Sequence, residues 1–95
     1  MAQIRWTPQA ADDLDAIADF IALDSSPYAN LFVLNVITSI DRLEQFPMLG
    51  RVVPEYQNPQ IRELLMGNYR IIYRLKEDFV EILTTYQGAR LLLIG

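Results

Sequence analysis

The sequence predicts an α+β fold in which an antiparallel helical hairpin covers one face of a small, mainly antiparallel sheet. Residues 8–45 carry apolar side chains at helical spacing with one short break, which is typical of two helices joined by a tight turn. Residues 61–86 form runs rich in β-branched, aromatic and aliphatic residues, separated by turn residues. With a strand candidate at 3–6, the order is β-α-α-β-β-β, and residues 1–95 are expected to form one domain.

The first helix is predicted to begin directly after the strand candidate Gln3 to Trp6. Thr7 is a good N-cap, and Pro8 suits the first helical position because the N–H that proline lacks is unpaired there in any case. A core-facing stripe follows at the spacing of a helix: Leu14, Ile17, Ala18 and Ile21. We expect this helix to end near Leu23.

The second helix is predicted to run from Pro27 to Gln45, with Ser26 as its N-cap. Phe46-Pro47 ends it, because proline cannot continue the hydrogen-bond ladder. The break before it is short, which favours an antiparallel pair of helices. Its expected apolar face consists of Ala29, Phe32, Val33, Val36, Ile37, Ile40 and Leu43.

A connector at 48–60 is too rich in glycine and proline for a helix or a central strand. A hairpin follows, with Gly67-Asn68 as its turn. In its second strand Tyr69, Ile71, Tyr73 and Leu75 share one face, whereas Arg70, Ile72, Arg74 and Lys76 share the other. After a turn at Glu77-Asp78, the last strand is predicted at Phe79 to Tyr86. The cationic face is expected to be exposed, because no further element is available to cover it.

Charge and composition exclude several functions. The net charge is −4, with −5 in residues 1–50 and +1 in residues 51–95. A protein that grips DNA or RNA phosphates normally has a basic excess, so we expect no direct DNA binding by this chain alone. There is no cysteine and no histidine, and we expect neither a metal site nor a cofactor. No apolar run approaches the about 20 residues of a membrane span, and no signal region is visible, so a cytoplasmic protein without a membrane partner is expected.

Four motifs, in this order, resemble those of the RelE/ParE superfamily of bacterial toxins. They are Phe46-Pro47-x-Leu49-Gly50-Arg51, Ile61-Arg62-Glu63-Leu64, Asn68-Tyr69-Arg70-Ile71-Ile72-Tyr73-Arg74 and Ile82-Leu83-x-x-x-Gln87-Gly88-Ala89-Arg90. The resemblance covers nearly the whole chain and implies the toxin of a type II toxin–antitoxin pair. It also implies a cognate antitoxin, encoded beside the toxin, whose C-terminal segment wraps and neutralises it.

The superfamily divides into RelE-like ribosome-dependent ribonucleases and ParE-like inhibitors of DNA gyrase. The resemblance makes Arg70 and Arg90 the counterparts of phosphate-contacting arginines of RelE-like members. However, the RelE lysines fall at Ile61 and Glu63, and no tyrosine follows Arg90. RNA cleavage needs a proton acceptor and a proton donor as well as cations. The sequence therefore favours a ParE-like gyrase inhibitor of the kind that stabilises plasmids. An mRNA endoribonuclease acting on the ribosome and a non-toxic antitoxin-binding homologue stay open, and with them the question whether the chain is an enzyme.

The candidate contact residues for the target or the antitoxin are Arg62, Arg70, Arg74, Tyr86 and Arg90. The alternative is that the arginines are solvated residues of an exposed strand face, with Arg62 paired to Glu63 or Glu81. Arg51 is expected to bind a carboxylate or a helix C-terminus, and Tyr69 and Tyr73 to pack beneath the helices. Asp12, Asp13, Asp15 and Asp19 are expected on a solvated helix face, and the apolar residues 91–94 against the domain or a partner.

Overall fold

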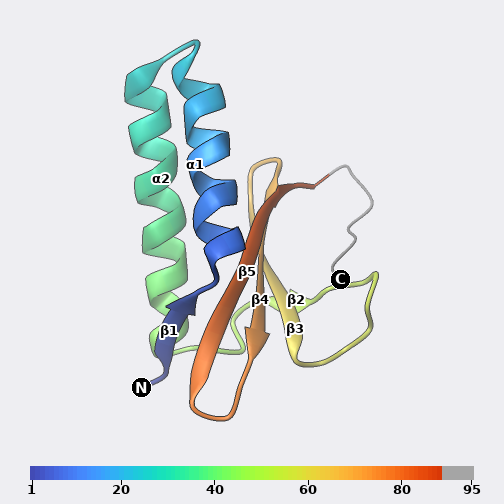
Figure 1. Ribbon diagram of the computed structural model, residues 1–95. Helices are drawn as coiled ribbons and strands as arrows, with labels where there is room; N and C mark the ends of the chain where they lie inside the picture. Colours follow the sequence, from blue (N-terminus) through green and yellow to red (C-terminus); the bar gives the residue numbers. More distant parts are fainter. Residues whose placement is uncertain (89–95) are drawn as a thin grey trace.

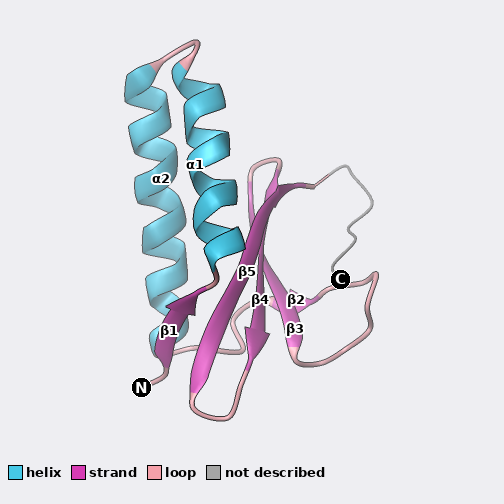
Figure 2. Ribbon diagram, in the orientation of Figure 1, coloured by secondary structure: helices cyan, strands magenta, loops and turns pink. Residues whose placement is uncertain are grey.

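The computed structural model describes residues 1–88, in which two helices pack against one face of a five-stranded sheet (Figures 1 and 2). The elements are β1 (Gln3–Trp6), α1 (Pro8–Ala22), α2 (Ser26–Asp41), η1 (Arg42–Glu44), β2 (Arg51–Val52), β3 (Ile61–Met66), β4 (Tyr69–Leu75) and β5 (Phe79–Gln87). The strand order is β1-β5-β4-β3-β2, with β1 parallel to β5 and the remaining pairs antiparallel. The predicted fold class is confirmed. Within residues 1–88, none of the helices has the length and apolarity that crossing a membrane requires.

The start of α1 agrees with the prediction. Thr7 is the N-cap, and its hydroxyl oxygen accepts a hydrogen bond of 3.0 Å from the backbone N–H of Ala10. The same hydroxyl donates to the carbonyl oxygen of Ile82 at 2.9 Å, which joins the helix start to β5. One side chain therefore caps the helix and fixes its position on the sheet.

The predicted N-cap of α2 is wrong by one residue. Ser25, with an extended backbone, is the N-cap, and its hydroxyl accepts a hydrogen bond of 3.3 Å from the N–H of Tyr28. Pro27 is then the second helical residue, where its missing N–H is equally harmless. The predicted end of this helix at Gln45 is also wrong. The α-helix α2 ends at Asp41, and the chain continues as the short 3₁₀ helix η1.

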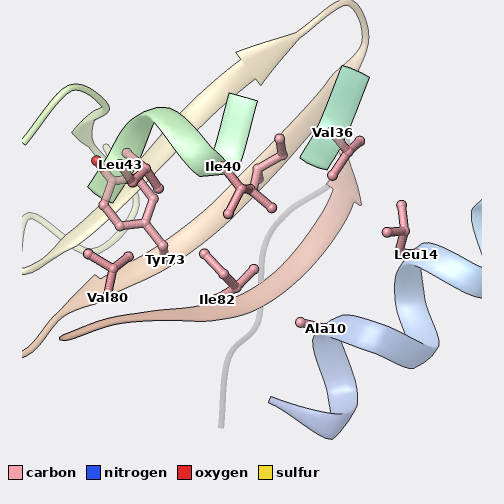
Figure 3. Close-up of a cluster of buried hydrophobic side chains, with 9 residues drawn as sticks. Ala10, Leu14, Val36, Ile40, Leu43, Tyr73, Val80 and Ile82 are labelled. Carbon is pink, nitrogen blue, oxygen red and sulfur yellow. The ribbon is translucent and has the colours of Figure 1, made fainter. Parts of the chain in front are cut away.

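The main core lies between the helical hairpin and the sheet (Figure 3). Its buried residues are Ala10, Leu14, Val36, Ile40, Leu43, Ile71, Tyr73, Val80 and Ile82. Tyr73 is fully buried as predicted, and Tyr69 packs edge-to-face on Phe32 of α2 with ring centroids 4.9 Å apart. Burial raises the pKa of Tyr73, so its hydroxyl stays protonated.

The hydroxyl of Tyr73 anchors the loop that carries the first motif. It donates to the carbonyl oxygen of Pro47 at 2.8 Å and accepts from the N–H of Gly50 at 2.9 Å. A Cβ atom at Gly50 would lie 2.5 Å from the carbonyl oxygen of Glu63 and 2.7 Å from Tyr73 Oη. A glycine is therefore needed at position 50 for the loop to approach β3 closely, so packing accounts for the glycine of this motif.

Within the predicted connector, residues 53–60 contain neither helix nor strand, and from here on the name connector means these residues. They cover the face of the sheet opposite the helices. Val53 and Ile61 are buried there against Ile72, with Tyr56 and Tyr86 among the side chains packed around them. The expectation that no part of the chain covers this face is wrong, because Val53 and Tyr56 fold back over it. The chain enters this region through β2, a strand that was not predicted and that pairs with β3.

Candidate functional site

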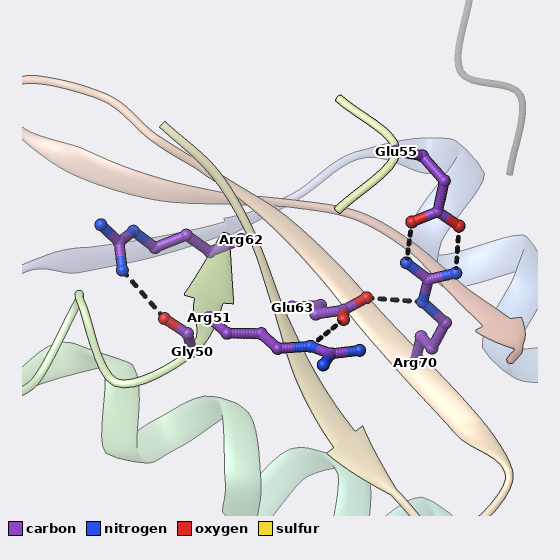
Figure 4. A network of polar contacts seen from close by, with 6 residues as sticks. All are labelled: Gly50, Arg51, Glu55, Arg62, Glu63 and Arg70. Atoms are coloured by element: carbon purple, nitrogen blue, oxygen red, sulfur yellow. Dashed lines mark hydrogen bonds and ion pairs between the residues drawn. The ribbon is translucent and has the colours of Figure 1, made fainter. Parts of the chain in front are cut away.

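A network of two arginines and two glutamates lies where the connector meets β2, β3 and β4 (Figure 4). Its centre is Glu63, whose side chain is 0% exposed. Glu63 Oε2 accepts a hydrogen bond from Nε of Arg51, and Glu63 Oε1 accepts one from Nε of Arg70, each at 2.5 Å. Both oxygens of the buried carboxylate are thus held by guanidinium groups.

The second glutamate, Glu55, comes from the connector and binds the remaining edge of Arg70. Nη1 and Nη2 of Arg70 donate to Oε2 and Oε1 of Glu55, both at 2.7 Å. Such two-point pairs are among the strongest hydrogen-bonded ion pairs in proteins. The hydrogen bonds from Arg70 lower the pKa of Glu55 from 4.5 to about 2, and the hydrogen bonds from Glu55 raise the pKa of Arg70.

The register of the strands brings these residues together. Arg51 of β2 lies directly opposite Glu63 of β3, and Ile72 of β4 lies opposite Glu63 on the other side. Arg70 is two residues from Ile72 on the same strand, so it reaches Glu63 diagonally across the same face. Three neighbouring strands therefore each contribute one charged group, and the connector adds Glu55.

An open pocket of about 720 Å³ lies beside the network, between the connector, the β3–β4 turn and the end of β5. Gly67, with φ of 58°, makes the turn possible and lines the pocket. The residues with polar or charged side chains that line it are Arg51, Glu55, Asn68, Tyr69, Arg70 and Gln87. Arg51 is the accessible cation, because its side chain is 58% exposed, whereas that of Arg70 is 7% exposed.

The expectation of an exposed cationic face is therefore wrong for Arg70. Arg70 does lie on the face away from the helices, as the alternation of β4 predicts. Glu63 and Glu55 neutralise it there, and the connector buries it. Alternation identifies the face of a side chain but gives no information about which loop will cover that face.

Of the other predicted contact residues, Arg62, Arg74 and Tyr86 lie within the described part of the chain. Tyr86 of β5 lies directly opposite Arg70 of β4, next to the network. Arg62 donates from Nε to the carbonyl oxygen of Pro59 at 2.9 Å and from Nη1 to that of Gly50 at 3.0 Å, so it holds the loop rather than pairing with an acid. Arg74 is half-buried, and its Nη1 lies 3.9 Å from Oε1 of Glu81. Tyr86 is half-buried beside the small core of the connector face. Arg90 and the apolar residues 91–94 lie outside the described residues.

Comparison with known proteins assigns the family. The model of the ParE toxin of type II toxin–antitoxin system, parDE, matches residues 4–92. The chain belongs to the ParE toxin family. It is 35% identical over 92 residues to Toxin RelE2 of Caulobacter vibrioides, an alignment that covers 96% of this chain and all 100% of the relative. The resemblance to the RelE/ParE superfamily is thereby confirmed, and the chain is a type II toxin of that superfamily.

Two solved structures share the fold of this ParE family member. The chromosomal ParDE system from P. aeruginosa gives a TM-score of 0.75 at 28% identity, covering 92% of this chain and 96% of that one. The toxin–antitoxin complex RelBE2 from Mycobacterium tuberculosis gives 0.64 at 20% identity, covering 90% and 96%. At that identity the second likeness supports the fold only.

Sequence reasoning missed the role of Glu55 and the burial of Glu63 in this ParE family member. A signal for Glu63 was present, because an acid between Ile61 and Leu65 on a strand interior needs a cationic partner when the strand is buried. Arg51 was correctly expected to bind a carboxylate. Asp13 was expected on a solvated face, but it accepts a hydrogen bond from the hydroxyl of Thr84 and joins α1 to β5.

The network has balanced charges, since two guanidinium groups face two carboxylates. Both oxygens of Glu63 and of Glu55 accept hydrogen bonds from arginine, so neither acid is free to take a proton from a substrate. In the described part of the chain there is no group of three or more potential metal ligands. The arrangement suits a rigid binding surface better than proton-transfer chemistry.

Proposed function

We propose that this ParE family toxin inhibits DNA gyrase by binding to it, without cleaving RNA, and that a cognate antitoxin neutralises it. The observation that carries the proposal is the state of Arg70. This residue matches a phosphate-contacting arginine of RelE-like ribonucleases, but its Nε, Nη1 and Nη2 atoms all donate to Glu63 and Glu55. A guanidinium group engaged in this way is not available to a phosphate.

Electrostatics supports the same reading. The transition state of RNA cleavage carries extra negative charge on the phosphate, which a site must match with excess positive charge and preorganised donors. Here Arg51 and Arg70 are balanced by Glu55 and Glu63. The chain also has no histidine, and Glu63 stands where RelE-like members have a lysine. Binding to a protein target needs none of these groups.

The surface of the helical hairpin supports a protein antitoxin. Large apolar side chains are exposed along α2 and at the tip of the hairpin: Phe20, Leu23, Tyr28, Leu31, Leu34 and Ile37. Exposed apolar residues gathered on one part of a surface are typical of protein–protein interfaces. The two solved relatives are described as a ParDE system and as a RelBE2 toxin–antitoxin complex, which favours the same kind of partner here. Arg62, Arg74, Tyr86 and Arg90 remain proposed contacts with the target or the antitoxin.

A supercoiling assay tests the proposal. Purified toxin is titrated into gyrase and relaxed plasmid, and the product of the neighbouring gene is then added. We expect supercoiling to be lost and then restored. Unchanged supercoiling at a large molar excess of toxin over gyrase would exclude gyrase as the target. Such a toxin would act in the cytoplasm and stabilise the plasmid or chromosomal region that encodes the pair.

Leu34→Asp tests the partner surface separately. Leu34 is 60% exposed on α2, so the substitution should leave folding intact. We expect the variant to need at least about tenfold more antitoxin for rescue, because a charge in an apolar interface core is strongly unfavourable. Gln45→Glu, at the exposed end of η1, is the matched control because it also adds one negative charge, and equal rescue of both variants would place the antitoxin elsewhere.

The second candidate is a RelE-like endoribonuclease that cleaves mRNA on the ribosome. The relative named Toxin RelE2 and the pocket beside Arg51 and Arg70 favour it. Programmed ribosomes with labelled mRNA test it, and uncut mRNA would exclude it. If expression without the antitoxin is harmless, the chain is instead a non-toxic homologue that binds the antitoxin.

A further inference from the structure

The helical hairpin, α1 and α2 with the turn between them, carries negative charge only. Residues 6–41 contain no lysine or arginine and six acids: Asp12, Asp13, Asp15, Asp19, Asp24 and Asp41. Asp13 is half-buried against Thr84 of β5, and the other five are exposed. Within residues 1–88, none of these five belongs to an ion pair. The hairpin therefore presents an acidic surface to solvent that the chain itself does not neutralise.

Two of the exposed acids lie at unfavourable positions. Asp19 is in the last turn of α1, and Asp24 follows shortly after the helix ends. The C-terminal end of a helix carries partial negative charge, which repels an acid and attracts a cation. The last turn of α1 contains no basic residue. A cationic partner at this end of the hairpin would relieve the repulsion.

Beside the acids lies an uncharged and largely apolar helix surface. From Ser26 to Ile40, α2 contains no charged residue. Side chains three positions apart are neighbours on a helix, and four large side chains that are between 42% and 69% exposed form such a row: Tyr28, Leu31, Leu34 and Ile37. On α1, Asp12, Asp15 and Asp19 form an acidic row at similar spacing. Because α1 and α2 lie side by side (Figure 1), the solvent side of the hairpin combines an apolar row with an acidic row.

An α-helix of another protein fits this surface best. The backbone groups within α1 and α2 are paired inside the helices, so the hairpin offers no strand edge to which a partner strand could add. A docked helix satisfies its own backbone hydrogen bonds and needs only side-chain contacts. A second copy of the chain is a poor partner, since each copy would bring aspartates and no cation to the contact. The complementary helix has apolar side chains along one row and lysine or arginine along the next.

We propose that the helical hairpin binds a basic amphipathic helix of the antitoxin. The apolar side chains of that helix pack on the row along α2, and its cations lie beside Asp12, Asp15 and Asp19 of α1. The inference rests on the proposed antitoxin and adds the chemistry of the antitoxin segment that binds here. Attraction between opposite charges steers the two proteins together and is screened by salt, so the affinity of the complex should fall as the salt concentration rises.

The double variant Asp15→Asn/Asp19→Asn tests the proposal, because both side chains are exposed and asparagine keeps their size and helix propensity. The product of the neighbouring gene is titrated into the toxin by calorimetry at low and at high sodium chloride concentration. We expect the double variant to raise the dissociation constant at least about tenfold at low salt and much less at high salt. Asp15→Lys/Asp19→Lys should raise it further. Glu77→Gln/Asp78→Asn is the matched control, since it removes two charges from the exposed turn between β4 and β5.

The outcomes separate this inference from the proposed function. If the toxin binds the antitoxin but Asp15→Asn/Asp19→Asn behaves as the control does, or if the lysine variant binds more tightly, the basic helix is excluded and the antitoxin remains a partner. If the wild type does not bind the product of the neighbouring gene, the proposed antitoxin fails as well, whereas inhibition of gyrase is measured without it. Sedimentation of the toxin alone should show a monomer. A dimer that Leu34→Asp dissociates would identify a second copy as the occupant and overturn the proposal.

Discussion

The two faces of the sheet are built by opposite means. On the helix face, nine buried residues from α1, α2, η1, β4 and β5 form one apolar cluster. On the connector face, three buried residues form a small cluster, and the remaining area is occupied by the charged network around Glu63. The first face is held by packing of regular elements, and the second by ion pairs to a connector without regular structure.

The two faces therefore differ in the interactions on which their stability depends. Apolar packing contains no titratable group, so its contribution to stability does not depend on pH. The ion pairs of the connector face instead contain titratable carboxylates, so their contribution to stability depends on pH. We therefore expect the stability of the helix face to depend on apolar burial and that of the connector face to depend on its ion pairs. The predictions that follow test this assignment.

The largest effect is expected from Glu63→Ala on the connector face. The substitution leaves Arg70 buried with Glu55 alone and removes the partner of Arg51, and breaking a buried ion pair typically costs about 3–5 kcal/mol. Urea unfolding followed by circular dichroism measures the loss. Glu81→Ala, which removes an acid paired with Arg74 at 3.9 Å, is the control and should cost little. Equal losses in both variants would mean that the network is not a structural unit.

A somewhat smaller loss is expected from Ile82→Ala on the helix face. Ile82 is 0% exposed in the main core, and truncation of such a residue costs about 3 kcal/mol through lost burial and the cavity left behind. The loss should change little with sodium chloride concentration. That of Glu63→Ala should change more, because Arg51, one partner of Glu63, is 58% exposed and salt screens its charge. Parallel urea titrations at low and high salt check the contrast, and a shared salt response would remove the distinction between the faces.

Much of the helix face could be predicted from the sequence. Helical spacing identified the stripe that includes Leu14, and the Thr7-Pro8 signal located the start of α1. The connector face could not be predicted in the same way. Period-two alternation placed Arg70 on that face, but the burial of Arg70 depends on Glu55, which is fifteen residues away on an irregular segment with no periodicity to read.

The same limit explains the small misplacements elsewhere. Ser26 and Ser25 are both acceptable N-caps, and the choice of Ser25 depends on how the chain leaves α1, which local propensity does not encode. Ile37 was predicted on the apolar face of α2, yet it is 42% exposed, whereas Leu34, which helical spacing left off that face, is exposed as expected. Only the position of the sheet beneath the helices decides which apolar side chains are left for a partner.

Tyr73→Phe is predicted to have an intermediate effect, because its hydroxyl joins the main core to the loop at Pro47 and Gly50. The substitution leaves the N–H of Gly50 without its acceptor in a buried place, which costs about 1–3 kcal/mol. Thermal unfolding measures the cost. Hydrogen exchange should show faster exchange at the N–H of Gly50 and unchanged exchange in α1 and α2. A uniform increase throughout the chain would contradict a local role for the hydroxyl.

The smallest effect, and the most specific to the connector face, is a dependence of stability on acid. The pKa of Glu55 is about 2 in the folded chain against its ordinary 4.5, so its contribution to stability is complete above pH 4.5. As the pH falls from 4.5 toward 2, the unfolded chain binds a proton on Glu55 before the folded chain does, and the contribution is lost.

The difference in unfolding free energy between wild type and Glu55→Gln should therefore shrink across this window, while the difference between wild type and Ile82→Ala stays constant. Urea titrations of the three proteins at pH 6, 4 and 3 measure both differences. If the first difference stays constant with pH, the pairing of Glu55 with Arg70 does not stabilise the connector.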